Sequence, residues 1–322
     1  MKIGIPRALL YYWYGRRWDK FFRECGHETL ISPPTDRNII RAGSTVAVEE
    51  LCLPVKIFLG HLQALAPEVD RVLVPHLVKV ERDAFICPKF MGLPDIVAHT
   101  LPQIHRQCLT IKVGPKNISM EGALRAALLK AARKDPGLKP KAVPPAGYGE
   151  DPLEFSGSPA LDIIRDYQLD PFPASVGPKR LNIGLLGHPY CIYDAAFNLN
   201  LLQLLKRNEV NVVTPEMLPK NYRGAGSGGL NKKLFWTTGR LQLDAWEWMR
   251  QDQTIRVAGF IQLSPFACGT EAVTGDLLER RIKMAKMPLL KLNFEEHSGE
   301  AGIITRVEAF LDLVRYHNAR AC

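Results

Sequence analysis

Short apolar runs alternate with amphipathic stretches along this chain, and one order of them occurs twice. The first copy begins with "KIGIPRALLYYWYG", and the second, past the middle of the chain, with "LNIGLLGHPYCIYD". Each copy opens with an Ile-Gly run and passes through a turn that contains Pro6 or Pro189. A helical stretch follows, and then a short β-branched run that stops at Pro33 or Pro215. This order of strand, turn, helix and strand predicts two α/β units with parallel strands.

Further apolar runs extend both predicted sheets. They are residues 71–77 in the first unit and residues 256–264 and 287–296 in the second. A last segment opens with Thr305 and Glu308 at the spacing of a capping box and continues with apolar residues at helical intervals. This pattern predicts a C-terminal helix.

A segment dense in proline and glycine separates the two units. Residues 134–159 read "KDPGLKPKAVPPAGYGEDPLEFSGSP", a composition that does not sustain regular structure for long. We therefore predict an N-terminal α/β domain over residues 1–178, with a linker at 134–178, and a C-terminal α/β domain over residues 179–322.

The composition indicates the class of protein, and it gives the chain a net charge. The chain of 322 residues is 46% hydrophobic and 23% charged, as is typical of a globular protein with two domains. No apolar run approaches the ~20 residues of a membrane span, and the N-terminus has no long apolar segment of a signal peptide, so a cytoplasmic location is the expectation. The net charge of +9 suggests an anionic partner. The basic residues lie in separate places without an aromatic–basic stripe, which favours a solvated basic surface over a nucleic-acid groove.

Three of the seven cysteines each end an apolar run, with proline or glycine close behind. They are Cys52 in "EELCLPVKIF", Cys87 in "FICPKFMGLP" and Cys268 in "LSPFACGTEA". Parallel sheets bind ligands beyond the carboxyl ends of their strands. All three thiols could therefore meet on one face, in a cleft between the two domains.

Metal ligation explains this placement better than nucleophilic catalysis does. Thiolates bind zinc and iron–sulfur clusters, and cysteines of a chain without signs of export seldom form structural disulfides. The alternative is three ordinary buried cysteines, because free cysteine is among the most buried residue types. The long spacings alone favour this alternative.

The other cysteines are distinguished by their neighbours in the sequence. Cys191, in "GHPYCIYD", is a fourth candidate, because it follows the first strand of the second domain on the sheet face expected for Cys268. We interpret Cys25 as a packing residue at a helix end and Cys108 as a core residue at the start of a strand. Cys322 is terminal, and we expect it to be exposed.

Seven long motifs together resemble one known family. They are "IGIPRALLYYWYGRRWDKFF", "EELCLPVKIFLGH", "FICPKFMGLPD", "HPYCIYDAAFNLN", "LFWTTGRLQLDA", "FACGTEAVTGDLLERR" and "FEEHSGEAGIITRVEAFLDLV". The family comprises the acyl-CoA dehydratase activase-related proteins, or CoA-protein activases. Its relatives are the cluster-bearing subunits of 2-hydroxyacyl-CoA dehydratases, benzoyl-CoA reductases and double-cubane cluster proteins. The likeness covers most of the chain except about residues 115–180.

The resemblance implies two Rossmann-like domains with a cofactor between them. This cofactor is a [4Fe–4S]-type cluster, either a single cubane or a sulfide-bridged double cubane, with three cysteines for each cubane. The matching positions are Cys52, Cys87 and Cys268. Cys191 stands where the family usually has asparagine, which leaves open whether the cluster has a fourth protein ligand. The motif at residues 295–298 reads Glu-Glu-His-Ser instead of the usual Asp-Glu-His-Thr.

The resemblance also implies a redox function. A separate ATP-hydrolysing iron–sulfur activator would deliver low-potential electrons, in agreement with the lack of a P-loop in this sequence. The chain would then be a reductase or dehydratase component of anaerobic metabolism that acts on an acyl-CoA or small-molecule substrate. The alternatives are a non-catalytic iron–sulfur electron carrier and a cluster-delivery or scaffold protein. We expect a homo-oligomer or a pairing with a homologous subunit.

Three residues near the expected cluster are candidates for catalytic roles, namely His188, His297 and Glu300. A structural turn is the alternative for His188, and a rigid glycine loop is the alternative for the other two.

A basic rim around the expected cluster would steer the activator by charge. Arg16, Arg17 and Lys20 in the first predicted helix offer such a rim.

Overall fold

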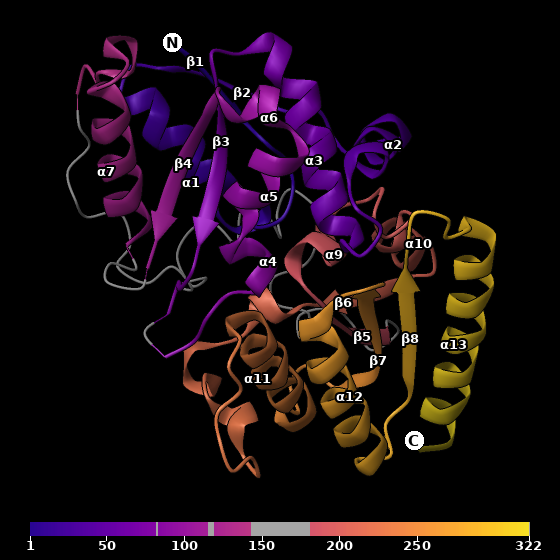
Figure 1. The fold of residues 1–322 in the computed structure, drawn as a ribbon. Coiled ribbons are helices and arrows are strands. Elements are labelled where there is room, and N and C mark those ends of the chain that lie inside the picture. Colours follow the sequence, from indigo (N-terminus) through magenta and orange to yellow (C-terminus); the bar gives the residue numbers. More distant parts are fainter. Residues whose placement is uncertain (82, 115–118, 143–180, 322) are drawn as a thin grey trace. The chain divides into compact units, whose positions relative to one another are not determined.

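The computed structural model describes residues 1–81, 83–114, 119–142 and 181–321 (Figure 1). The chain divides into two compact units. Among the described residues, unit 1 holds those up to 142 together with 235–237, and unit 2 holds the others. Each unit is an α/β structure with one four-stranded parallel sheet, so the predicted fold class is confirmed. The predicted boundary near residue 178 lies outside the described residues.

The sheet of unit 1 has the strand order β2-β1-β3-β4. Its strands are β1 (Lys2–Ile5), β2 (Glu28–Ile31), β3 (Arg71–Leu77) and β4 (Cys108–Val113). Residues 72–77 of β3 pair with all of β4 in one unbroken parallel register. The interior of β3 is almost wholly buried, as expected for a central parallel strand that is covered on both faces.

Helices cover both faces of this sheet (Figure 1). They are α1 (Tyr11–Glu24), α2 (Arg37–Val46), α3 (Leu53–Leu65), α4 (Pro88–Met91), α5 (Leu93–Thr100), α6 (Pro102–His105) and α7 (Met120–Ala132). Helices α1 and α7 lie on one face and touch where the indole N–H of Trp18 points at the sulfur of Met120, 3.3 Å away. Helix α3 lies on the other face, where Leu65 packs over Gly4 of β1.

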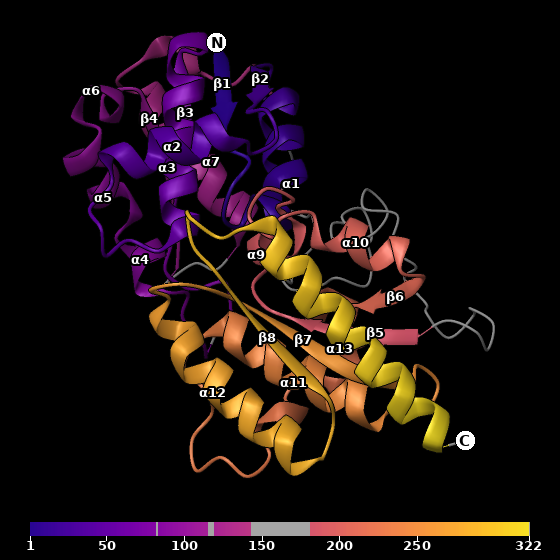
Figure 2. The same cartoon turned by 90° about the vertical axis from the view of Figure 1, so that its right-hand side faces the viewer.

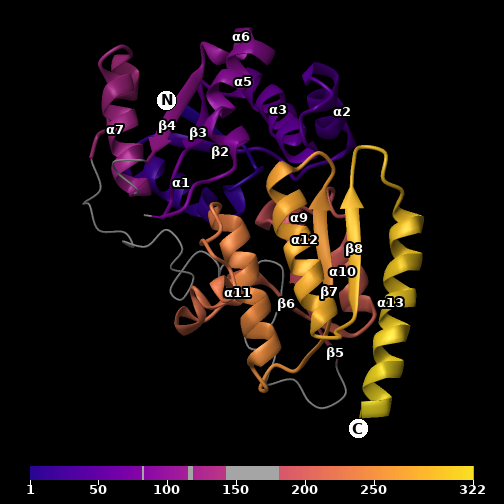
Figure 3. The same cartoon turned by 60° about the horizontal axis from the view of Figure 1, so that its bottom comes forward.

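Unit 2 repeats the strand order of unit 1, as β6-β5-β7-β8. Its strands are β5 (Leu181–Leu186), β6 (Val210–Val213), β7 (Val257–Pro265) and β8 (Leu289–Phe294). Its helices are α9 (Pro189–Tyr193), α10 (Leu201–Arg207), α11 (Thr237–Gln251), α12 (Gly269–Met284) and α13 (Glu300–Ala321). Helices α11 and α12 cover one face of the sheet, and α10 and α13 cover the other (Figures 2 and 3). The repeat seen in the sequence therefore corresponds to two sheets of equal topology. Of the helices that the structure describes, none is long and apolar enough to cross a membrane.

The C-terminal helix begins earlier than predicted. Helix α13 starts at Glu300, and Thr305 lies inside it, where its hydroxyl donates to the carbonyl of Ala301 at 3.1 Å. Thr305 is therefore not a cap. A threonine hydroxyl can bond the carbonyl four residues earlier within a helix, so a threonine at capping-box spacing does not by itself mark a helix start.

Helices α2 and α3 approach each other backbone to backbone at two glycines. A Cβ atom on Gly43 would lie 1.8 Å from the carbonyl oxygen of Lys56, and one on Gly60 would lie 2.0 Å from that of Ile39. Helix α3 begins directly after Cys52. The close contact thus fixes where this cysteine lies within unit 1.

His61 of α3 is buried in an environment that disfavours its charged form. It is fully buried, and its Nε2 atom lies 3.0 Å from the hydroxyl of Thr35. Burial and the charge of Arg7 lower the pKa of His61 to about 4, although Asp36 acts in the opposite direction.

We expect unit 1 to lose stability as the pH falls from about 6.5, the ordinary pKa of histidine, towards the lowered value. In that window the unfolded chain binds a proton at this position and the folded chain does not, which favours unfolding. His61→Gln should reduce the slope of stability against pH there by up to about 1.4 kcal/mol per pH unit. Urea denaturation at a series of pH values measures both slopes, and equal slopes would contradict a buried neutral histidine.

Candidate functional site

The loops after β5 and β7 lie side by side at the carboxyl edge of the unit 2 sheet. These two strands are neighbours, but the chain leaves them in opposite directions, towards β6 and towards β8. Such a topological switch point is where open parallel sheets bind ligands. The loop after β5 carries His188, and the loop after β7 carries Cys268.

These two predicted site residues contact each other. The sulfur of Cys268 lies 3.8 Å from Nε2 of His188 and 3.4 Å from the hydroxyl of Thr270. The ring of His188 is 1% exposed and stacks on Tyr190, with a centroid distance of 5.0 Å. Cys268 stands directly before α12, and His188 stands directly before α9. The two helix starts thus fix the cysteine and the histidine against each other.

A buried carboxylate, which the sequence did not indicate, lies next to the same ring nitrogen. Oε2 of Glu271 lies 3.3 Å from Nε2 of His188, and Glu271 is 2% exposed. Gln242 donates to Oε2 and Gln262 donates to Oε1 of this carboxylate, both at 3.1 Å. The available signal was a glutamine inside the apolar strand "GFIQLS", because a buried amide needs a polar partner.

These contacts shift the pKa values of both titratable partners. Burial alone would lower the pKa of His188, but the hydrogen bond with Cys268 and the charge of Glu271 outweigh it and raise the pKa. Burial alone would raise the pKa of Cys268, but the hydrogen bonds with His188 and Thr270 and the charge of His188 lower it. The site therefore favours a thiolate at Cys268.

Two other cysteines lie in environments that raise the pKa of the thiol. Burial and the charge of Glu24 raise the pKa of Cys25 to about 11, and burial raises the pKa of Cys108 to about 12. Cys25 follows α1 and is fully buried, which agrees with a packing role. Cys108 begins β4 and is half-buried, less enclosed than a core residue. Cys322 lies outside the described residues.

Unit 1 brings Cys52 and Cys87 onto neighbouring segments. Cys52 precedes α3 and is 7% exposed, whereas Cys87 precedes α4 and is half-buried. The Nζ atom of Lys89 donates to the carbonyl oxygen of Glu50 at 2.9 Å, which ties the first turn of α4 to the loop before α3. Since connecting helices of parallel sheets start beyond the carboxyl ends of the strands, both cysteines lie at that edge of the unit 1 sheet.

The predicted ligand set is thus divided between the units, with two cysteines in unit 1 and one in unit 2. Within the described ranges, no group of three or more His, Cys, Asp or Glu side chains has a geometry that could hold a metal ion. Neither unit supplies the predicted set alone. A cluster bound by Cys52, Cys87 and Cys268 together stays a prediction.

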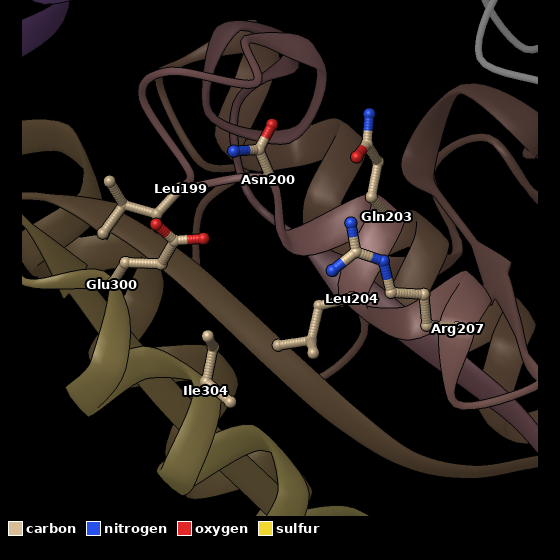
Figure 4. Close-up of a pocket in the computed structure, with 7 residues that line it drawn as sticks. All are labelled: Leu199, Asn200, Gln203, Leu204, Arg207, Glu300 and Ile304. Carbon is tan, nitrogen blue, oxygen red and sulfur yellow. The ribbon is translucent and has the colours of Figure 1, made fainter.

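The remaining candidates lie at other places in unit 2. Cys191 is fully buried in α9, and its N–H donates to the carbonyl of His188 at 2.9 Å. His297 lies in an exposed turn after β8. Glu300 begins α13 and lines a small pocket against α10 (Figure 4). The other lining residues are Leu199, Asn200, Gln203, Leu204, Arg207 and Ile304. Catalytic roles for His297 and Glu300 therefore stay predictions without a structural link to Cys268.

The basic residues of α1 form only part of a rim. Arg16 and Lys20 are exposed, whereas Arg17 is half-buried. The ammonium of Lys20 lies 3.8 Å from the carboxylate of Glu24. This mixed-charge surface is what an ordinary solvated helix also presents.

Comparison with known proteins gives a family match within unit 1. No curated protein matches the chain. Residues 2–148, which include all four strands of unit 1 and both Cys52 and Cys87, match the family described as "CoA enzyme activase uncharacterised domain (DUF2229)".

Proposed function

We propose that this chain is an iron–sulfur protein of the 2-hydroxyacyl-CoA dehydratase or double-cubane type, in which Cys52, Cys87 and Cys268 bind a [4Fe–4S]-type cluster. The observation that carries the proposal is the setting of Cys268. Its sulfur is approached by the ring nitrogen of His188 and the hydroxyl of Thr270, and its pKa is lowered. The thiolate is the form of cysteine that binds iron.

The chemistry of the donor set fits such a cluster. Iron–sulfur clusters take thiolate sulfur as their ligand. Cys52 and Cys268 stand before helices of 13 and 16 residues, whose first N–H groups favour negative charge. Cys87 stands before a helix of only 4 residues, but the cation of Lys89 lies in that first turn. The raised pKa values of Cys25 and Cys108 set those two thiols apart from a ligand role.

A bound cluster of this type supplies one-electron redox chemistry at low potential. The residues around Cys268 would position and shield it. His188 would direct an N–H group at the sulfur of Cys268, and Thr270 would add a hydroxyl donor. Tyr190, by stacking on the imidazole, would hold the ring in place and keep water from it.

We further propose that the electrons come from a separate ATP-hydrolysing iron–sulfur activator and pass to an acyl-CoA or another small molecule. The family description of residues 2–148 supports an association with CoA enzyme activases. Encounters between redox partners use small interfaces that charge steers. The exposed Arg16 and Lys20 on α1 would contribute positive charge to that encounter.

Iron and acid-labile sulfide content, measured on protein purified without oxygen, tests the cluster. We expect brown protein with about four iron and four sulfide ions per chain, because the three proposed ligands of one chain serve one cubane. Zinc in a colourless protein, or no metal in protein whose fold is intact by circular dichroism, would contradict the proposal.

A further inference from the structure

Glu271 favours a hydrogen on the ring nitrogen of His188 that lies near Cys268. The carboxylate presents only acceptor oxygens to its neighbours, and it already accepts from the amides of Gln242 and Gln262. Nε2 of His188 lies 3.3 Å from Oε2 of Glu271, so this nitrogen must present an N–H group instead of a lone pair. The same nitrogen lies 3.8 Å from the sulfur of Cys268.

The other ring nitrogen of His188, Nδ1, is buried and has no hydrogen-bond partner among the described residues. A histidine near a metal is usually oriented by a group on its far nitrogen. Here the orientation depends on the near nitrogen, through Glu271, and on the stacking with Tyr190.

We propose that Glu271 is a positioning residue, which holds the Nε2–H of His188 on the sulfur of Cys268 and thereby raises the reduction potential of the cluster. This inference rests on the proposed function. Reduction adds negative charge to a cluster, and hydrogen bonds to its sulfur atoms stabilise that charge. Gln242 and Gln262 contribute to this positioning, because their amides hold the carboxylate of Glu271 in place.

Two variants remove the hydrogen bond from Nε2–H of His188 to the sulfur of Cys268 in different ways. His188→Phe keeps an aromatic ring to stack on Tyr190 but has no N–H. Glu271→Gln keeps the size of the side chain, but its amide can donate to Nε2, so an N–H is no longer required there. We expect each to lower the equilibrium constant for one-electron reduction about tenfold, or ~59 mV. The double variant should not lower the potential below that of His188→Phe alone, because Glu271 acts through His188.

Glu216→Gln is the matched control. Glu216 is also 2% exposed, accepts from the hydroxyl of Tyr193 at 2.9 Å, and raises the pKa of His188 through its charge. Loss of a buried negative charge by itself makes reduction easier, so this variant should raise the potential or leave it unchanged. If Glu271→Gln shifts the potential upwards as well, Glu271 is only a buried charge and the inference is overturned.

Spectroelectrochemical titration of anaerobically purified protein measures the potential, and iron content is determined on the same samples. Wild-type protein without iron overturns both the function and this inference. Full iron with an unchanged potential in both variants overturns the inference alone.

A second measurement does not need the Glu271 variant to fold. Nitrogen-15 NMR of histidine-labelled, cluster-free protein identifies His188 by the signal that is lost in His188→Phe. It then shows whether Nε2 carries a hydrogen. We expect hydrogen on Nε2, and a lone pair there would overturn the inference.

Discussion

Unit 1 should lose at least about 3 kcal/mol of stability when Gly43 is replaced by alanine, at the upper end of the cost of overpacking. The added methyl group would lie 1.8 Å from the carbonyl oxygen of Lys56, which belongs to the backbone of α3. A flexible side chain could move aside, but a helix backbone cannot yield without separating α2 from α3. Since Gln63 of α3 also donates to the carbonyl of Ala42 at 3.0 Å, that separation breaks a hydrogen bond as well.

Gly302→Ala is the control for this prediction. Gly302 also lies inside a helix, α13, but apart from the neighbouring backbone of that helix no atom lies within 4 Å of the position of an added Cβ. Alanine there should be neutral or should stabilise unit 2 by about 0.5–1 kcal/mol through helix propensity. Urea denaturation followed by tryptophan fluorescence reports on both variants, because Trp13 and Trp18 are buried in unit 1 and Trp246 and Trp248 are buried in unit 2. An unchanged midpoint for Gly43→Ala would contradict the backbone contact.

The consequence of the Gly43 contact extends to Cys52. Helix α3 begins directly after this cysteine, and the contact at Gly43 and Gly60 sets its distance from α2. An alanine at either glycine would therefore also displace a predicted ligand. Stability and cluster binding are coupled at this point of unit 1.

The strands were the most predictable part of the fold. Parallel strands covered on both faces require continuous apolar sequence, and such runs stand out from their surroundings. Residues 71–77 form β3 as predicted, and the run at 256–264 forms β7 with a shift of one residue at each end. The repeated strand–helix–strand order then gave two parallel sheets, because parallel strands need a crossover connection between them.

The features that were not predicted depend on contacts between segments far apart in the sequence. Glu271 lies in "GTEAVTGDLLERR", where Asp276 is a solvent-exposed acid of the same helix. Helical spacing alone does not separate the two carboxylates. Only the approach of Gln242, His188 and Gln262 from three other segments makes Glu271 a buried acceptor.

Part of the site could be predicted, because two of its residues directly follow predicted strands. His188 and Cys268 each follow a strand of one sheet, so chain order and topology were enough to place them at one edge. Cys52 does not follow a strand directly. The loop that carries it is joined to the Cys87 segment by the hydrogen bond from Lys89 to the carbonyl of Glu50, a contact that no periodicity reveals.

The affinity for cluster iron should fall at least about tenfold, and the iron bound per chain should fall with it, when any one of Cys52, Cys87 and Cys268 is replaced by alanine. Loss of an orienting partner already costs a metal site 10–100-fold in affinity, and loss of a ligand should cost no less. Iron and sulfide per chain, measured under anaerobic conditions with the visible spectrum, report the result. Cys108→Ala is the matched control, because its thiol has a pKa raised by burial to about 12 and is not expected to bind iron.

Cys191→Asn completes this series, because it restores the residue that the resembling family usually has. Cys191 is fully buried in α9 next to His188, so we expect the variant to keep its iron. Loss of all iron in this variant alone would make Cys191 an obligatory ligand. A Cys268→Ala protein that keeps full iron and an unchanged spectrum would exclude Cys268 as a ligand. In that case the lowered pKa of its thiol would need another explanation, and nucleophilic chemistry at the Cys268–His188–Glu271 site would become the next hypothesis to test.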